Sequence, residues 1–267
     1  MLALLIIYYN HPEQLQDFLL SLKKNQTKEI KLFIADLSQN LKLEKNYGLN
    51  IQIIPGKNKG YSYGVNLGLK AALSQNISQF CVLNYDTYLD SRFVKQVLNG
   101  FKTSSFFGGK IYYARGYEYH KNRYQSKELG KVLWYAGGTI NWDHGTVTHR
   151  GVDEVDKGLY NKIEPTGFIP GTLMAFTKEV VDKVGFWDER FFLYYEDTDY
   201  CVRAQKENIK LIYDPKIVIW HKNAGITGGV GSKLHIKQQR YSRLLFGLKH
   251  APWRTKIHLL INFFINK

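Results

Sequence analysis

The chain has 267 residues, of which 44% are hydrophobic and 22% are charged, so it can bury a sizeable core and is not a disordered polymer. At about 150 residues per domain, this length allows one large α/β domain or two small ones. The two cysteines, Cys81 and Cys201, lack C-x-x-C spacing, which argues against a disulfide scaffold or a zinc module. We expect both thiols to be reduced, as in a cytosolic protein.

The net charge of +14 is concentrated at the C-terminal end. The last acidic residue is Asp214, and the part of the chain before Lys216 is nearly balanced, with 27 basic and 23 acidic residues. The basic residues after Asp214 are Lys216, Lys222, Lys233, Lys237, Arg240, Arg243, Lys249, Arg254, Lys256 and Lys267. A nucleic-acid-binding protein would carry its basic residues on the body, and no nucleic-acid motif is present, so we expect no nucleic-acid partner.

Apolar runs and helical patterns alternate through the first hundred residues, which predicts βαβ units and a parallel sheet. Strands are predicted over 2–8, 30–35, 51–54 and 80–83, with helices over 12–24 and 62–73. From residue 106 the strands become shorter and mixed, and they are predicted over 108–113, 134–138, 146–149, 170–176 and 217–221. No stretch reaches about 18 apolar residues, and the opening run lacks a basic region, so we expect neither a membrane span nor secretion.

Polar residues follow three of the predicted strands: Asn10, Asp36, and the run Asn84-Tyr85-Asp86. Taken singly, each suits a turn or a cap. Because ligands bind outside the carboxyl ends of parallel strands, their coincidence on one rim favours a ligand site there.

A glycine occurs every fourth residue at the start of the second helix, at Gly60, Gly64 and Gly68. The spacing matches neither a dinucleotide fingerprint nor a P-loop. Two interpretations stay open: close packing of the helix on the sheet, and binding of a diphosphate at the helix N-terminus.

Three acids, Glu196, Asp197 and Asp199, begin a predicted helix behind an aromatic cluster. Capping explains one or two of them, and Asp199 can pair with Arg203 four residues on. Three carboxylates this close beside an apolar wall should raise the pKa of at least one, which suits a general base. His221 ends a late strand, and with Asp86 it could complete a site for Mn²⁺ or Mg²⁺.

These motifs together resemble the family 2 glycosyltransferases, in their bacterial rhamnosyltransferase-like branch. The resemblance covers about residues 1–245 and rests on the glycine block, Asn84-Tyr85-Asp86-Thr87, Gly137-Gly138, Gly171-Thr172-Leu173-Met174, Tyr195-Glu196-Asp197-Thr198-Asp199 and Trp220-His221. It implies a GT-A fold, an α/β architecture with a mainly parallel sheet flanked by helices and a smaller mixed β part. It also implies an inverting enzyme that uses a nucleotide-diphosphate sugar and a divalent metal. The domain would span 1–232, with a donor half of about 1–105 and an acceptor half of about 106–232.

The resemblance also implies residue roles. Asp197 matches the catalytic base, and Asp86, joined by His221, matches the metal ligand. The first acid of the family's D-x-D motif is Asn84 here, and Tyr85 stands where the branch often has proline, so weak or exchangeable metal binding is expected. Donor contacts are expected from Tyr9, Asn10, Asp36, Asn58, Gly60, Asn66, Asn84 and Asp86. Acceptor or catalytic support is expected from Glu196, Asp199, Gly137, Gly138 and Trp134.

The tail, residues 233–267, has the composition of a pair of basic amphipathic helices. Residues 234–267 could lie on an anionic membrane surface, which predicts a cytoplasmic protein held on the inner face of the cell membrane. The alternatives are docking on the domain and a homodimer. The expected donor is a dTDP- or UDP-sugar and the acceptor a glycan or a lipid-linked molecule, with metal-dependent nucleotidyl transfer as the alternative reaction.

Overall fold

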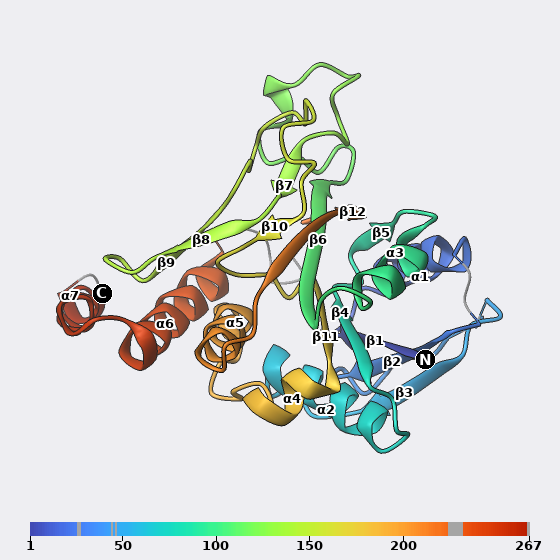
Figure 1. The fold of residues 1–267 in the computed structure, drawn as a ribbon, viewed down its shortest axis with the longest axis horizontal. Helices are drawn as coiled ribbons and strands as arrows, with labels where there is room; N and C mark the ends of the chain where they lie inside the picture. Colours follow the sequence, from blue (N-terminus) through green and yellow to red (C-terminus); the bar gives the residue numbers. More distant parts are fainter. Residues whose placement is uncertain (26–27, 44, 46, 224–231, 266–267) are drawn as a thin grey trace.

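The computed structural model describes residues 1–25, 28–43, 45, 47–223 and 232–265. Its centre is a ten-stranded sheet in the order β10-β12-β6-β11-β4-β1-β2-β3, in which β5 also pairs with β12 and β7 with β6 (Figure 1). The strands of this sheet are β1 (Leu2–Tyr8), β2 (Ile30–Asp36), β3 (Ile51–Pro55), β4 (Gln79–Leu83), β5 (Thr87–Leu89), β6 (Phe106–Tyr113), β7 (Leu133–Tyr135), β10 (Glu164–Pro165), β11 (Leu173–Thr177) and β12 (Ile212–His221). A separate hairpin joins β8 (Gly138–Asn141) to β9 (Thr146–His149).

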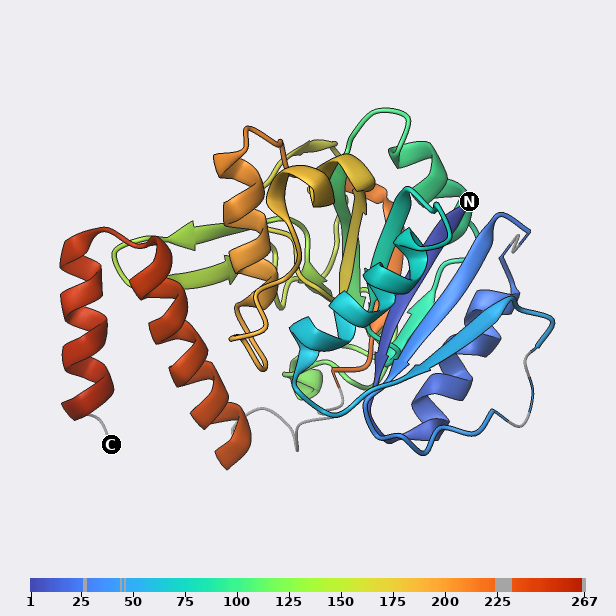
Figure 2. The same ribbon diagram turned by 90° about the horizontal axis from the view of Figure 1, so that it is seen from below.

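The helices cover both faces of the sheet, and the two helices at the C-terminal end of the chain lie beside it (Figures 1 and 2). They are α1 (Pro12–Lys23), α2 (Tyr61–Leu73), α3 (Phe93–Gly100), α4 (Lys178–Val184), α5 (Glu196–Lys206), α6 (Lys233–His250) and α7 (Trp253–Ile265), with a short 3₁₀ turn at Lys121–Arg123. Asn25, just after α1, bonds to the backbone of Val94 in α3 and of Asp90, which ties these two helices together. Trp187 stacks on Tyr200 of α5 and contacts Tyr61 of α2, so these two helices share the other face.

The sheet has a parallel half and a mixed half, as the sequence predicts. Strands β3, β2, β1 and β4 are parallel, and every residue of β1 is buried because helices cover both faces. Beyond them, β11 runs antiparallel between β4 and β6, and β12 runs parallel to β6. Both cysteines are free and buried. The predicted α/β architecture is confirmed.

Several predicted strands differ from the observed ones. Strand β6 begins at Phe106 and β12 at Ile212, both earlier than predicted. Two further differences arise at turns. The segment 134–138 is not one strand, because the chain turns at Gly137 (φ +96°), so that β7 pairs with β6 and β8 with β9. The strand predicted over 170–176 begins only at Leu173, whose N–H donates to the Pro170 carbonyl in a turn. In both places backbone turns that the apolar pattern does not reveal set the boundary.

The glycines of α2 pack this helix against β1. A side chain at Gly64 would collide with Ile7, and one at Gly68 would press on Leu5. Gly60 (φ +101°) lies against the backbone of Phe192, and the N–H of Tyr61 donates to the Phe192 carbonyl at 2.7 Å. These contacts favour the packing interpretation of the glycine spacing.

The helix α6 docks on the domain. Its Phe246 shares a small apolar core with Phe191, Tyr195 and Val202, and Ser242 donates to the Leu193 carbonyl at 2.7 Å. The described helices include none that is long and apolar enough to cross a bilayer. Of the basic residues in the tail, Lys267 lies outside the described residues, as does the junction at 224–231. The boundary at residue 232 stays a prediction.

Candidate active site

A cleft of about 720 Å³ opens at the carboxyl ends of β1 and β4, beside the N-terminus of α5. It brings together residues from the whole chain that the sequence placed in one site. The predicted site residues that line it are Tyr9, Asn58, Gly60, Asn84, Asp86, Trp134, Glu196, Asp197 and His221. The cleft therefore lies on the predicted rim of the parallel sheet.

Asp86 and His221 meet on one wall of this cleft. The pairing of β5 with β12 sets Thr87 opposite His221, and the Lys222 N–H donates to the Asp86 carbonyl at 2.8 Å. His221 Nε2 lies 3.3 Å from Asp86 Oδ1, and both side chains are almost fully buried. Asp86 Oδ1 and His221 Nδ1 have no hydrogen-bond partner among the described residues.

This pair fits a divalent cation that takes its other ligands from a bound diphosphate. A buried carboxylate oxygen without a hydrogen-bond partner is costly unless a cation or a donor reaches it. Mg²⁺-type sites commonly use one or two carboxylates together with substrate phosphates and water. Among the described residues, no group of three or more His, Cys, Asp or Glu side chains is placed to hold a metal ion.

Asp197 lies at the start of α5 and is held by backbone groups. Gly171 N–H donates to its Oδ2 at 2.9 Å, and the N–H of Thr198 donates to its Oδ1 at 2.6 Å. Burial raises the pKa of the Asp197 carboxyl, while these donors and the Thr198 hydroxyl hold it down. The result is an oriented carboxylate with an elevated pKa, which is the form that a general base requires.

Glu196, its neighbour, has a different environment. Its side chain is buried at the cleft, and Oε2 has no hydrogen-bond partner among the described residues. Burial and the charge of Asp197 raise the pKa of Glu196 well above its ordinary value. When the pKa values of two adjacent acids differ, the acid with the higher pKa can donate a proton while the other accepts one.

Tyr61 connects the two sides of the cleft. Its hydroxyl bonds to Asn84 Oδ1 at 2.9 Å and to the Gly171 carbonyl at 3.0 Å, while Asn84 Nδ2 donates to Thr172 Oγ1 at 3.3 Å. Asn84 is thereby held by its neighbours. Tyr85 also lines the cleft, and its hydroxyl donates to the carbonyls of Tyr9 and Asn10, so it supports the turn after β1.

Asp199 belongs to a buried ion cluster behind the cleft. Its carboxylate contacts Arg203 Nε at 2.8 Å, Lys249 Nζ at 2.6 Å and His250 Nε2 at 2.7 Å. The pairing with Arg203 agrees with the sequence prediction. Burial opposes ionisation, but His250, Arg203 and Lys249 outweigh it and lower the pKa of Asp199. This arrangement fixes α6 on α5 and leaves Asp199 away from the described lining of the cleft.

Other predicted site residues also lie outside the described lining of the cleft. Asp36 accepts hydrogen bonds from the backbone of Ser38, Gln39 and Leu41, and so organises the loop after β2. Asn66 bonds to both the N–H and the carbonyl of Trp187, which joins α2 to the segment before α5.

The remaining three are Asn10, Gly137 and Gly138. Asn10 is an exposed residue in the left-handed region, with φ 59°. Gly138 lies against the Phe168 ring, and Gly137 against Arg150. Their roles in binding stay predictions.

Several lining residues were not identified from the sequence. His149 ends β9, and its Nδ1–H donates to the Trp134 carbonyl at 2.8 Å; burial lowers its pKa to about 4, so its Nε2 is an acceptor at neutral pH. Gln238 and Gln239 reach the cleft from α6, in a segment that sequence analysis treated only as a basic tail. The sequence offered one signal for these residues, which is the position of His149 at the end of a predicted strand.

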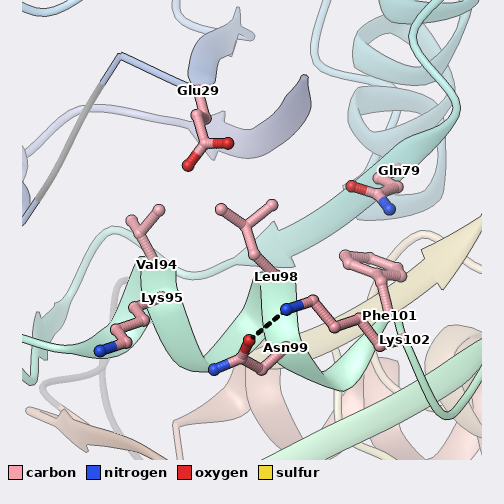
Figure 3. Close-up of a pocket in the computed structure, with 8 residues that line it drawn as sticks. All are labelled: Glu29, Gln79, Val94, Lys95, Leu98, Asn99, Phe101 and Lys102. Carbon is pink, nitrogen blue, oxygen red and sulfur yellow. Dashed lines mark hydrogen bonds between the residues drawn. The ribbon is translucent and has the colours of Figure 1, made fainter.

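A second pocket, of about 350 Å³, lies at the opposite edge of the sheet, between α3 and the starts of β2 and β4. Figure 3 shows its lining, in which Lys102 Nζ donates to Asn99 Oδ1 at 3.0 Å. Its remaining polar residues, Glu29, Gln79 and Lys95, come from separate elements. The described lining of this pocket holds one acid, Glu29, and no histidine, whereas the described lining of the cleft holds three acids and two histidines.

The chain has a GT-A fold, a mixed α/β sheet with a cleft at the ends of its parallel strands, like the solved glycosyltransferases that it resembles. The chain belongs to glycosyl transferase family group 2, whose model matches residues 80–241. It is similar to the dTDP-rhamnosyl transferase RfbF of Shigella flexneri, with 24% identity over 226 residues, 77% of this chain and 66% of RfbF. It is also similar to the low-salt glycan biosynthesis hexosyltransferase Agl10 of Haloferax volcanii, with 26% identity over 161 residues, 58% of this chain and 46% of Agl10.

Among solved structures, the chain resembles the mannosyltransferase PcManGT of Pyrobaculum calidifontis in complex with GDP-Man and Mn²⁺. The TM-score is 0.57 at 10% identity, over 99% of this chain and 70% of that one, and so low an identity shows the fold alone. The chain spans less than two thirds of the length of the two curated relatives.

Proposed function

We propose that this chain is an inverting glycosyltransferase. It would move rhamnose or another hexose from a dTDP- or UDP-sugar to a saccharide or lipid-linked acceptor, in the synthesis of a cell-surface polysaccharide or glycoconjugate. The observation that carries this proposal is the meeting of Asp86 and Asp197 in one cleft of about 720 Å³, a size typical of small-molecule sites. The names of the relatives RfbF and Agl10 support a rhamnosyl or hexosyl donor.

The reaction is a single displacement. An acceptor hydroxyl attacks the anomeric carbon, a new carbon–oxygen bond forms, and the bond from that carbon to the diphosphate breaks. Asp197 takes the hydroxyl proton, and the nucleoside diphosphate leaves with the electron pair. A positioned base of this kind contributes about 10²- to 10⁴-fold in rate. The acceptor oxygen attacks opposite the leaving diphosphate, so a single displacement inverts the anomeric carbon. No covalent intermediate on the protein is formed.

Asp86 and His221 are the residues that would hold a divalent metal at the diphosphate. The metal, Mn²⁺ or Mg²⁺, would neutralise charge on the leaving group. The solved structure of PcManGT, which shares this fold, holds GDP-Man and Mn²⁺, and this supports a divalent metal in general without indicating which residues would hold it. Glu196, which burial favours in its protonated form, would donate a hydrogen bond to a sugar hydroxyl.

A donor panel tests the proposal. We expect one of dTDP-rhamnose, UDP-glucose or UDP-galactose to raise the melting temperature and, with Mn²⁺ present, to release nucleoside diphosphate. Release of pyrophosphate from a nucleoside triphosphate incubated with a sugar 1-phosphate and Mn²⁺ would instead indicate nucleotidyl transfer and would overturn the proposal.

A further inference from the structure

The outermost element of the molecule is α7, which lies beyond α6 in both views (Figures 1 and 2). Its inner face is fixed: Thr255 Oγ1 donates to the Trp142 carbonyl at 2.8 Å, and Leu259 is buried over Gly247 of α6, which has no room for a side chain. The helix therefore presents a defined outer face.

That outer face is apolar. Trp253 and Phe264 are 67% and 65% exposed, and Ile257, Leu260 and Ile261 are exposed between them. At 3.6 residues per turn, these five positions fall within an arc of about 100°. A continuous stripe of large apolar side chains directed at solvent indicates an interaction surface.

The charges that flank the stripe indicate its partner. Arg254 and Lys256 lie on either side of it, and residues 215–267 contain no Asp or Glu at all. A second copy of the chain docked through the same face would bring two cationic helices together with no acid of their own to neutralise them. An anionic lipid surface accepts both the apolar stripe and the basic flanks.

We propose that α7 docks the protein on an anionic bilayer surface, with Trp253, Ile257, Leu260, Ile261 and Phe264 inserted into the interface. The helix is 13 residues long, which suits a position in the interface plane. Through α6, whose residues Leu234, Gln238 and Gln239 line the cleft, docking would hold the active site near the membrane. An acceptor carried by a lipid would then reach Asp197, a consequence that rests on the proposed function, whereas the docking itself does not.

The test is flotation of the full chain with vesicles of phosphatidylcholine alone or mixed with phosphatidylglycerol. We expect binding to the mixed vesicles, weakened by salt, and a blue shift of tryptophan emission that Trp253→Phe removes, because Trp253 is the exposed tryptophan. Ile257→Glu with Phe264→Glu should lower partitioning at least about tenfold. Leu159→Glu with Ile163→Glu, at two exposed apolar residues elsewhere on the surface, adds the same charge, is the matched control and should bind normally.

Three outcomes would overturn the proposal. These are no flotation of the wild-type chain, equal flotation of the double variant, and self-association that the double variant loses while no vesicles bind. The last outcome would assign the stripe to a second copy. Because the readout is binding, failure here leaves the glycosyltransferase proposal standing.

Discussion

The backbone N–H of Gly171 donates a hydrogen bond of 2.9 Å to Asp197 Oδ2. Gly171 also accepts a hydrogen bond from Tyr61, whose hydroxyl bonds to Asn84. A short chain of contacts thus connects the proposed base to the segment that carries Asp86. Residues of α2 and α5 and of the turns next to β4 and β11 are thus held in place by hydrogen bonds as well as by apolar packing.

The proposed base should set the acid limb of the pH profile. Since burial raises the pKa of Asp197, the group accepts a proton at a higher pH than an exposed aspartate does, and activity should fall as pH drops through that raised value. His149, whose pKa is lowered to about 4, stays neutral through the upper part of this limb. The measurement is kcat/KM against pH with saturating metal. A profile that stays flat down to the ordinary aspartate range would contradict the assignment.

Glu196 should act as a hydrogen-bond donor through its protonated carboxyl. Its raised pKa favours the protonated form, so Glu196→Gln, which also donates, should stay within about tenfold of wild-type kcat/KM. Glu196→Ala should lose about tenfold more, because it removes the donor and opens space in the cleft. Steady-state kinetics of the two variants compare these roles. Equal activity of Glu196→Ala and wild type would show that the side chain is dispensable.

The metal assignment predicts coupled loss of metal and donor binding. Asp86→Asn and His221→Gln should each remove the gain in donor affinity that Mn²⁺ gives, since they alter the two groups that approach within 3.3 Å. Calorimetry with and without Mn²⁺ measures this gain. Asp90→Asn, at a partly exposed acid paired with Arg92, is the control. An unchanged gain in both variants would place the metal elsewhere.

Asp199 should matter for stability. It is fully buried among Arg203, Lys249 and His250, so Asp199→Asn should cost about 3 to 5 kcal/mol in the free energy of unfolding. The exposed pair of Lys178 and Asp182 is the control, where Asp182→Asn should cost less than about 0.5 kcal/mol.

The same carboxylate gives a pH signature. Its folded pKa is lowered, so its contribution is present above the unfolded value and is lost as pH falls toward the folded one. Denaturant unfolding at several acidic pH values should show a shallower pH dependence in Asp199→Asn. An equal slope in the variant and wild type would argue against this ion cluster.

The sequence predicted β1, β2, β3 and β4 to within one residue at each end, since buried apolar runs between turn residues are a local signal. The convergence of strand ends on one rim predicted the place of Asp86, whereas the place of Asp197 in the same cleft, at the start of α5, was implied by the family resemblance. The sequence did not reveal that Asp36 and Asp199 would find their partners within the protein. Such partners depend on tertiary contacts, as with Lys249 and His250, which come from a helix about 50 residues along the chain from Asp199.

The place of two residues of α6 also could not be predicted from the sequence. Gln238 and Gln239 carry no charge and follow no motif, so only the docking of α6 on α5 reveals that they border the cleft. The turn at Gly137 likewise depends on the pairing of β8 with β9 rather than on local apolar pattern.

Replacement of the proposed base is the most direct test. Asp197→Asn keeps an oxygen that can accept the Gly171 N–H but cannot take up a proton at neutral pH. We expect turnover to fall by about 10²- to 10⁴-fold, while calorimetry shows the same affinity for the nucleotide-sugar donor. Turnover at the wild-type rate in a variant that binds donor normally would contradict the account.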